Sequence, residues 1–494
     1  MRLIDTAYID GAFVTVSGDE VLEIVNPANG EPIGRQRLAS RQDARRAIAA
    51  ASRAQATLSH STTAERLDML RSLEAAILRR ADEIRDVTIE EYGAPISRAR
   101  WISQYASDCF GYAAEALQRY PFSRRIGDAT VRMEPVGVSA LIAPWNAAAG
   151  TICSKLASAL AAGCASVIKP SELSGLQSQV VTEALDSAGL AAGIFNVVVG
   201  RGSDVGDELG THPDVARISF TGSTATGKAI ARAASETMKR VSLSLSGKSA
   251  AILLDDADFQ AAIPMALNGG FQNNGQACIA GTRILVPHDR LAEVEAIVRA
   301  AMGAWKVGDP ADPETTLGPL ANAAQFDRVQ RYIARGIEQG ATLIAGGPGR
   351  PDGLAKGHFV RPTVFADARN NMDIARDEIF GPVLSIIAYT DDDDAVAKAN
   401  DTAYGLQAYV YSRDVERASR IGERLMAGSI LINRVTPDLR APFGGVKQSG
   451  IGREFGIFGL ESFLEPKAIV REHAETRDAA AQPWRGQGSI TVFY

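Results

Sequence analysis

The spacing of hydrophobic residues changes several times along the chain. Residues 8–35 alternate short apolar runs with turn signals, which predicts short strands and hairpins. From Arg41 to about Leu117 apolar residues recur at helical intervals, so we expect amphipathic helices there. Residues 130–135 alternate like an exposed strand, which can serve as an edge for subunit pairing.

From Val136 onward, patterns of buried strands alternate with helical patterns. The predicted strands are Val136–Ala143, Ser166–Pro170, Phe195–Val199 and Arg217–Phe220, and an alanine-rich helix ending at Ala162 follows the first. Such alternation predicts a parallel sheet covered on both faces, with ligands bound beyond the carboxyl ends of the strands. A second α/β succession begins near Ala250 and runs to about residue 447. At the end of the chain, residues 473–485 form a polar, alanine-rich tail, and residues 489–494 offer a short terminal strand.

Composition limits the class of protein. The chain has 494 residues, 46% of them hydrophobic and 22% charged, with a net charge of −6, so it is long enough for two or three globular domains. Mild acidity argues against nucleic acid or an anionic membrane as the main partner. The four cysteines lack metal-ligand spacing and are too few for a disulfide framework, which indicates a reducing compartment and no metal site. Without a signal-peptide core or a membrane-spanning apolar run, we expect a cytoplasmic protein.

One stretch carries candidate chemistry. Residues 271–283 form a polar, glycine-punctuated loop that contains Cys278 and leads into the apolar run Ile284–Val286. Asn and Gly allow unusual backbone conformations, and the flanking apolar residues anchor such a turn in a core. The pattern can therefore present a thiol at the mouth of a rigid element, although a lone cysteine is more often a small buried hydrophobe.

Six motifs, in order, extend this interpretation. They are Pro144-Trp145-Asn146, Lys169-Pro170-Ser171-Glu172, Phe220-Thr221-Gly222-Ser223, Gly275-Gln276-Ala277-Cys278, Glu378-Ile379-Phe380-Gly381-Pro382 and Pro442-Phe443-Gly444-Gly445. Together they resemble the aldehyde dehydrogenase superfamily over roughly residues 8 to 470. The resemblance implies an α/β protein with a Rossmann-like NAD-binding domain (1–116 and 136–247), an α/β catalytic domain (248–447), and a small β oligomerisation arm with the C-terminal segment (117–135 and 448–494). It also implies a homodimer or homotetramer, in which the strand at Thr130 and the C-terminal segment pair between subunits.

The resemblance assigns catalytic roles that agree with the chemistry of the residues. Oxidation of an aldehyde requires a tetrahedral adduct from which hydride can leave, and a thiolate forms that adduct and then a thioester. Cys278 matches the nucleophile, and the Asn146 amide with the Cys278 backbone N–H matches the donors for the oxyanion. The alternative role for Asn146 is that of a helix cap, and the capping and oxyanion roles are not exclusive. Lys155 matches a lysine of a proton relay, and its alternative role is that of a snorkelling helix lysine.

The resemblance also implies NAD as cofactor. Lys169 matches a residue that binds the adenosine ribose, and Glu172 favours NAD over NADP because it repels a 2′-phosphate. The turn from Gly222 opens a helix whose amides can meet the pyrophosphate. The expected cofactor-binding residues are Trp145, Lys169, Glu172, Gly202, Gly222, Ser223, Gly227, Leu245, Glu378 and Phe380.

The sequence departs from the family at the general base. Residues 243–248 read Leu-Ser-Leu-Ser-Gly-Lys, where the family has Leu-Glu-Leu-Gly-Gly-Lys, so Ser244 occupies the base position, 34 residues before Cys278. A second family Glu, sometimes regarded as an alternative base, is Ile457 here. Serine cannot accept a proton near neutral pH, and loss of a positioned base typically costs ~10²–10⁴-fold in the step that it serves.

Three hypotheses follow for the resolution of the thioester. Another group, or water held by Ser244, hydrolyses it slowly. Alternatively coenzyme A resolves it, as in CoA-acylating semialdehyde dehydrogenases. In the third, the chain is a nucleotide-binding protein with weak turnover.

The expected substrate is a small aldehyde. Small residues after Asn146, namely Ala147, Thr151 and Ser154, predict a wide or polar vestibule. A loop that matches the substrate-anchoring segment carries Arg434, Asp438 and Arg440, which favours a substrate with a polar or carboxylate end.

Overall fold

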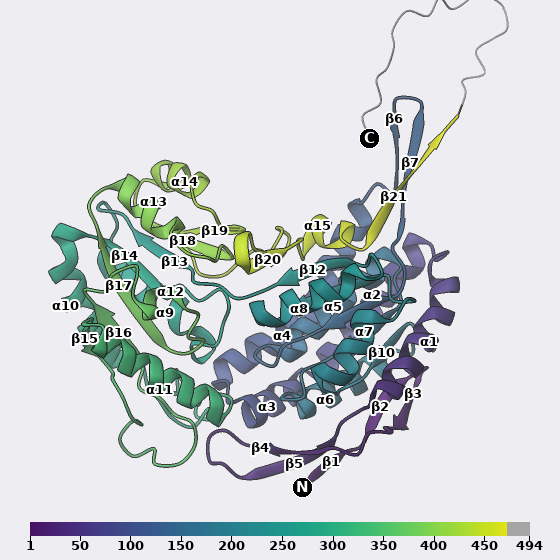
Figure 1. The fold of residues 1–494 in the computed structure, drawn as a ribbon, viewed down its shortest axis with the longest axis horizontal. Helices are drawn as coiled ribbons and strands as arrows, with labels where there is room; N and C mark the ends of the chain where they lie inside the picture. The colour runs from purple at the N-terminus through teal and green to yellow at the C-terminus, as the bar shows by residue number, and fades with distance from the viewer. Residues whose placement is uncertain (472–494) are drawn as a thin grey trace, which may run out of the picture.

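The computed structural model describes residues 1–471, and its largest element is an eight-stranded sheet (Figure 1). The strand order is β20-β12-β11-β8-β9-β10-β2-β3. Five central strands run parallel: β8 (Ser139–Ile142), β9 (Ser166–Lys169), β10 (Phe195–Val197), β11 (Arg217–Thr221) and β12 (Arg240–Ser244). The edges are antiparallel: β2 (Thr6–Ile9), β3 (Ala12–Thr15) and β20 (Gly450–Ile451).

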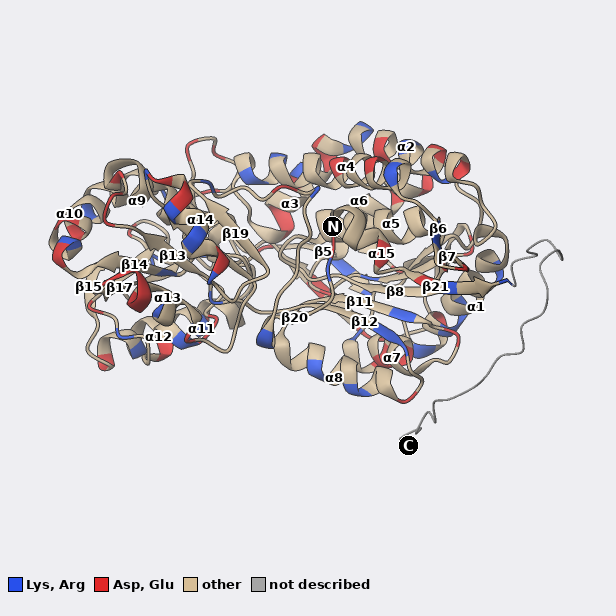
Figure 2. Cartoon of the chain, turned by 90° about the horizontal axis from the view of Figure 1, so that it is seen from above, with Lys and Arg blue, Asp and Glu red and all other residues tan. Residues whose placement is uncertain are grey.

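Helices cover both faces of this sheet, which explains why its central strands are almost entirely buried. Figure 2 shows α2, α4, α5 and α6 on one side of the sheet and α7 and α8 on the other. The helices are α1 (Arg41–Leu58), α2 (Thr63–Arg79), α3 (Ala81–Tyr92), α4 (Ile96–Arg119), α5 (Ala148–Ala162), α6 (Gly175–Asp186), α7 (Asp207–Thr211) and α8 (Thr224–Ser235). The predicted alternation of strands and helices is confirmed, including the end of α5 at Ala162.

The second α/β unit contains a seven-stranded sheet of order β15-β16-β17-β14-β13-β18-β19. Its strands are β13 (Ala250–Leu253), β14 (Arg283–Pro287), β15 (Thr342–Ala345), β16 (Thr363–Ala366), β17 (Val383–Tyr389), β18 (Gln407–Tyr411) and β19 (Ser429–Ile432). Its helices are α9 (Phe259–Phe271), α10 (Leu291–Ala301), α11 (Ala323–Glu338), α12 (Asp373–Arg376), α13 (Asp392–Asn400) and α14 (Val415–Glu423). The chain thus passes from the first sheet to the second between Ser244, where β12 ends, and Ala250, where β13 begins.

Two three-stranded sheets complete the fold. One consists of β1 (Arg2–Ile4), β5 (Pro32–Arg37) and β4 (Val21–Val25). The other is an arm that projects from the body in Figure 1, made of β6 (Ser123–Ile126), β7 (Ala129–Pro135) and β21 (Leu464–Val470). Within the arm, β7 pairs along its whole length with β21 of the same chain and on its other side with β6. The expected tail at 473–485 and strand at 489–494 lie outside the described residues.

The C-terminal part of the described chain returns to the first α/β unit. β20 joins the edge of the first sheet beside β12, and Leu460 and Phe463, at and just after α15 (Gly456–Glu461), enter the core of that unit. The second unit has separate apolar clusters of its own. No helix within residues 1–471 is long and apolar enough to cross a membrane. The expected α/β class, with Rossmann-like and catalytic units, is confirmed.

Candidate active site

The loop that follows α9 holds an unusual conformation. Asn273, Asn274 and Gly275 all have positive φ, of 57°, 58° and 72°, and a Cβ on Gly275 would lie 2.2 Å from the Gly381 carbonyl carbon. The Asn273 amide donates to the backbone oxygens of Asn146 and Gln276 at 3.0 and 3.1 Å. The loop is therefore fixed by its own buried amides, as the Asn- and Gly-rich sequence predicted.

This loop presents Cys278 at the surface of a cavity. Three cysteines, Cys109, Cys153 and Cys164, are buried, whereas Cys278 is partly exposed. Desolvation raises the pKa of Cys278 to about 12, and the carboxylates of Glu378 and Glu454 add to the effect. The group is thus a thiol at neutral pH before any ligand binds, and it must lose a proton to become a nucleophile.

The Asn146 side chain lies beside the thiol in the same cavity. It follows β8, and its Nδ2 donates to the Gln276 backbone oxygen at 2.8 Å. A primary amide carries two N–H groups, so the second can serve an oxyanion. The helix-cap alternative is wrong, because Ala147 is the N-cap of α5 and that cap receives no side-chain hydrogen bond.

Ser244 lies at the carboxyl end of β12, also facing this cavity. Its side chain is buried, and among the described residues its Oγ has no hydrogen-bond partner. Thr221 Oγ1, on the paired position of β11, is likewise buried and unpartnered within residues 1–471. The base position therefore holds two free hydroxyls and no carboxylate of its own.

Lys155 is buried in α5 and does not snorkel. Its Nζ forms an ion pair with Glu454 and donates to Ser219 Oγ at 2.9 Å, while burial lowers its pKa. Glu454 was not predicted from the sequence, in which Ile457 occupies the position of the family's second Glu. Ile457 is exposed, whereas Glu454, which follows the short strand β20, reaches the buried lysine. The signal available was the acidic residue directly after Gly452-Arg453, but its pairing partner is almost three hundred residues away.

A cavity of about 550 Å³ joins most of the predicted cofactor residues to the catalytic ones. Those that line it are Trp145, Gly222, Ser223, Leu245, Glu378 and Phe380, together with Asn146, Ser244 and Cys278. Gly227 does not line it and instead packs on Leu245, where a Cβ would lie 2.5 Å from a methyl carbon. Gly202 lies outside the cavity, at the start of a short helical turn.

Lys169 and Glu172 lie in a neighbouring region. Lys169 Nζ is 3.6 Å from Glu172, and Arg201 approaches the same carboxylate at 3.3 Å. Glu172 and Trp145 both line an adjoining cavity of about 360 Å³, so the two cavities share the indole between them. The two cavities together offer a charged end and a thiol-bearing end for an extended ligand.

The larger cavity fits a dinucleotide. Ser223 caps α8 by accepting from the Thr226 N–H at 3.2 Å, which leaves the first amides of a twelve-residue helix open toward an anion. A Cβ on Gly222 would lie 2.4 Å from the Phe220 ring, so the turn tolerates no side chain. Glu378, which lines the same cavity away from the start of α8, is held in place by a hydrogen bond that it accepts from the Gly247 N–H at 3.1 Å.

A second opening lies between α4 and the loop that carries Arg434, Asp438 and Arg440. Arg434, Asp438 and Arg440 line a cavity of about 280 Å³ together with the stacked rings of Trp101 and Tyr105, whose centroids are 4.9 Å apart. The predicted wide vestibule is partly filled by Tyr105, which packs so closely that a Cβ on Gly150 would lie 2.3 Å from its ring.

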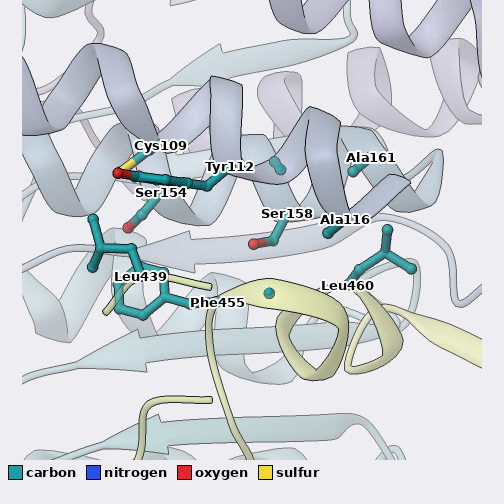
Figure 3. A pocket seen from close by; sticks show the side chains of 11 residues that line it. Cys109, Tyr112, Ala116, Ser154, Ser158, Ala161, Leu439, Phe455 and Leu460 are labelled. Atoms are coloured by element: carbon teal, nitrogen blue, oxygen red, sulfur yellow. The ribbon is translucent and has the colours of Figure 1, made fainter. Parts of the chain in front are cut away.

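Behind this opening, a narrow cavity between α4, α5 and α15 brings together Cys109, Ser154 and Phe455 (Figure 3). Ser154, which lies on α5, therefore lines this inner cavity. Acidic and basic residues intermingle over the outer helices of the described chain (Figure 2).

Comparison with known proteins agrees with this geometry. The model of the aldehyde dehydrogenase family matches residues 13–469. The 3-succinoylsemialdehyde-pyridine dehydrogenase of a Pseudomonas species is 42% identical over 465 residues, which are 94% of this chain and 98% of that protein. A mutant aldehyde dehydrogenase C from Pseudomonas syringae, bound to NAD+ and octanal, superposes with a TM-score of 0.93 at 44% identity, covering 94% and 96% of the two chains. An aldehyde dehydrogenase of Mycobacterium tuberculosis complexed with NAD+ gives a TM-score of 0.93 at 38% identity, covering 96% and 99%.

Proposed function

Since this chain belongs to the aldehyde dehydrogenase family, we propose that Cys278 is its nucleophile. The enzyme oxidises an aldehyde to a carboxylic acid with NAD+, through a cysteine thiohemiacetal and a thioester. One observation supports the assignment to Cys278 above others: the only partly exposed thiol of the chain shares a cavity with the Asn146 amide and the capped start of α8.

The other site residues take the following roles. The Asn146 amide and the Cys278 N–H donate to the oxyanion when the thiol adds to the carbonyl. The amides of Gly222 and the following turn would hold the phosphates of NAD+, which when bound would supply the hydride acceptor. Lys169 and Glu172 would hold the adenosine ribose. The buried pair of Lys155 and Glu454 carries protons away from the site.

Substrate and assembly are further parts of the proposal. The substrate is a small aldehyde with a polar or carboxylate end that meets Arg434, which is exposed and has no ion-pair partner within residues 1–471. The similarity to a dehydrogenase named for a pyridine semialdehyde supports a polar substrate. The cofactor unit comprises 1–116 and 136–247, and the catalytic unit 248–447. The arm, whose Ile126 and Val470 are exposed, joins subunits into a homodimer or homotetramer. The assembled enzyme is cytoplasmic.

A CoA-acylating semialdehyde dehydrogenase is the second candidate. The observation that favours it is the neutral hydroxyl of Ser244 at the base position, which has no hydrogen-bond partner within residues 1–471. A thiol acceptor is deprotonated more readily than water, so it depends less on a nearby carboxylate.

Rapid mixing of enzyme, NAD+ and an aldehyde panel distinguishes these candidates. Steady NADH formation without CoA supports hydrolysis, and a stoichiometric burst that becomes turnover only with CoA supports acyl transfer. Cys278→Ala should abolish the burst, whereas Cys164→Ala, a buried cysteine in the core, is the matched control that should retain it. A burst that survives Cys278→Ala would refute the nucleophile assignment.

A further inference from the structure

The Glu378 carboxylate lies close to the thiol loop. Its Oε1 accepts from the Gly247 N–H at 3.1 Å, and a Cβ on Gly247 would lie only 2.2 Å from the Cys278 carbonyl oxygen. A single glycine therefore separates this carboxylate from the backbone of Cys278. Both side chains also line the same cavity of about 550 Å³, where a water molecule can reach them together.

Two serines line the cavity that holds this carboxylate, one of them at the position where the family has its general base. Ser244 and Ser246 are alternate residues of one extended segment, and both line the cavity. Burial raises the pKa of Glu378, and the Ser246 hydroxyl partly offsets this rise. The sequence that lacks a carboxylate at Ser244 thus contains, two residues later, a hydroxyl that lines the same cavity as another carboxylate.

The alternative carboxylate is less suited to accept a proton. Glu454 forms an ion pair with the buried Lys155 and accepts from Ser219 Oγ at 3.3 Å. Its charge is already neutralised by a direct cation. Glu378 has no such ion pair among the described residues, although the charges of Arg328 and Lys248 act on it from nearby.

We propose that Glu378 is the general base for hydrolysis of the Cys278 thioester, which rests on the proposed role of Cys278. Glu378 removes a proton from a water molecule that the Ser244 hydroxyl orients. The water oxygen bonds to the thioester carbonyl carbon, the C–S bond breaks, and the carboxylic acid and the Cys278 thiolate are released. The proton on Glu378 then passes to the Cys278 thiolate, which restores the thiol and the free carboxylate of the starting state.

Deacylation without NAD+ tests this role separately from any contact of Glu378 with the cofactor. The enzyme is acetylated by p-nitrophenyl acetate and desalted, and loss of the acetyl group is followed by intact-protein mass spectrometry, with Cys278→Ala as the blank. We expect Glu378→Gln to lose the acetyl group ~10²-fold more slowly than the wild type. Hydroxylamine, which needs no general base, should remove it from both proteins at equal rates, as expected for two intact, equally accessible thioesters.

Matched variants identify the group responsible. Asp377→Asn changes the adjacent carboxylate, which is exposed and accepts from the Tyr332 hydroxyl at 2.9 Å, and it should deacylate at the wild-type rate. Wild-type deacylation in Glu378→Gln, or slow deacylation only in Glu454→Gln, overturns the inference. Absence of acetyl from Cys278 in the wild type would instead overturn the nucleophile assignment on which it rests.

Discussion

Replacement of Asn146 by alanine tests the proposed catalytic role of its side-chain amide separately from the structural role of that amide. The side chain donates to the Gln276 backbone oxygen at 2.8 Å, but that oxygen also accepts from Asn273 at 3.1 Å. The Gln276 oxygen therefore keeps one of its two side-chain donors in the variant. Loss of a hydrogen bond of this kind costs about 0.5–1.5 kcal/mol of unfolding free energy.

The effect on catalysis should be much larger. Loss of one oxyanion donor typically lowers kcat by about 10²–10³-fold, or about 2.7–4 kcal/mol. The assay is the rate of the NADH burst in stopped flow, because the burst reports formation of the thioester and not its hydrolysis. Thermal unfolding measured on the same samples gives the structural cost.

A control variant keeps the shape of the side chain. Asn146→Asp replaces the amide by a carboxylate, which cannot donate and repels the oxyanion, so its burst should be at least as slow as that of Asn146→Ala. If the burst of Asn146→Ala stays within about tenfold of the wild type, or about 1.4 kcal/mol, the oxyanion role is refuted. A fall in melting temperature that accounts for the whole loss of activity would also refute it.

Three further substitutions test other parts of the site. Ser244→Glu should raise steady turnover by up to ~10²-fold if thioester hydrolysis limits the rate, and unchanged turnover would contradict the importance of a base at that position. Gly222→Ala, whose Cβ would lie 2.4 Å from the Phe220 ring, should weaken NAD+ binding by about tenfold in calorimetric titration, or about 1.4 kcal/mol. Burial lowers the pKa of Lys248, whose Nζ has no hydrogen-bond partner in the described part of the chain, to about 7. Its contribution to the free energy of unfolding should therefore rise by about 1.4 kcal/mol per pH unit from pH 7 to 10. Lys248→Met should lack this rise in denaturant titrations, and an identical slope in both proteins would contradict the assignment.

Much of the fold could be predicted because its signals are local. The alternation of strands and helices from Ser139 to Ser235 depends on apolar spacing over a few residues, and the motifs at 144–146, 169–172 and 220–223 lie at strand ends. The Cys278 loop was predictable for the same reason, since Asn and Gly in sequence determine its positive φ angles.

Contacts between distant segments could not be predicted in this way. β20 has only two residues, and it carries no periodicity that would reveal its pairing with β12 or the position of Glu454. Ser246 and Glu378 line the same cavity, although 131 residues separate Gly247, next to Ser246, from Glu378. Only the assembled fold reveals which carboxylates surround the thiol.

The pairing of β7 with β21 has a consequence for biosynthesis. More than three hundred residues separate the two strands, so a ribosome must synthesise nearly the entire polypeptide before β7 can pair with β21. At translation rates of about 5–20 residues per second, the exposed edge waits for roughly fifteen seconds to a minute. During that interval its free N–H and C=O groups can pair with another nascent chain, so chaperone demand should be greatest for products that stop just short of Leu464.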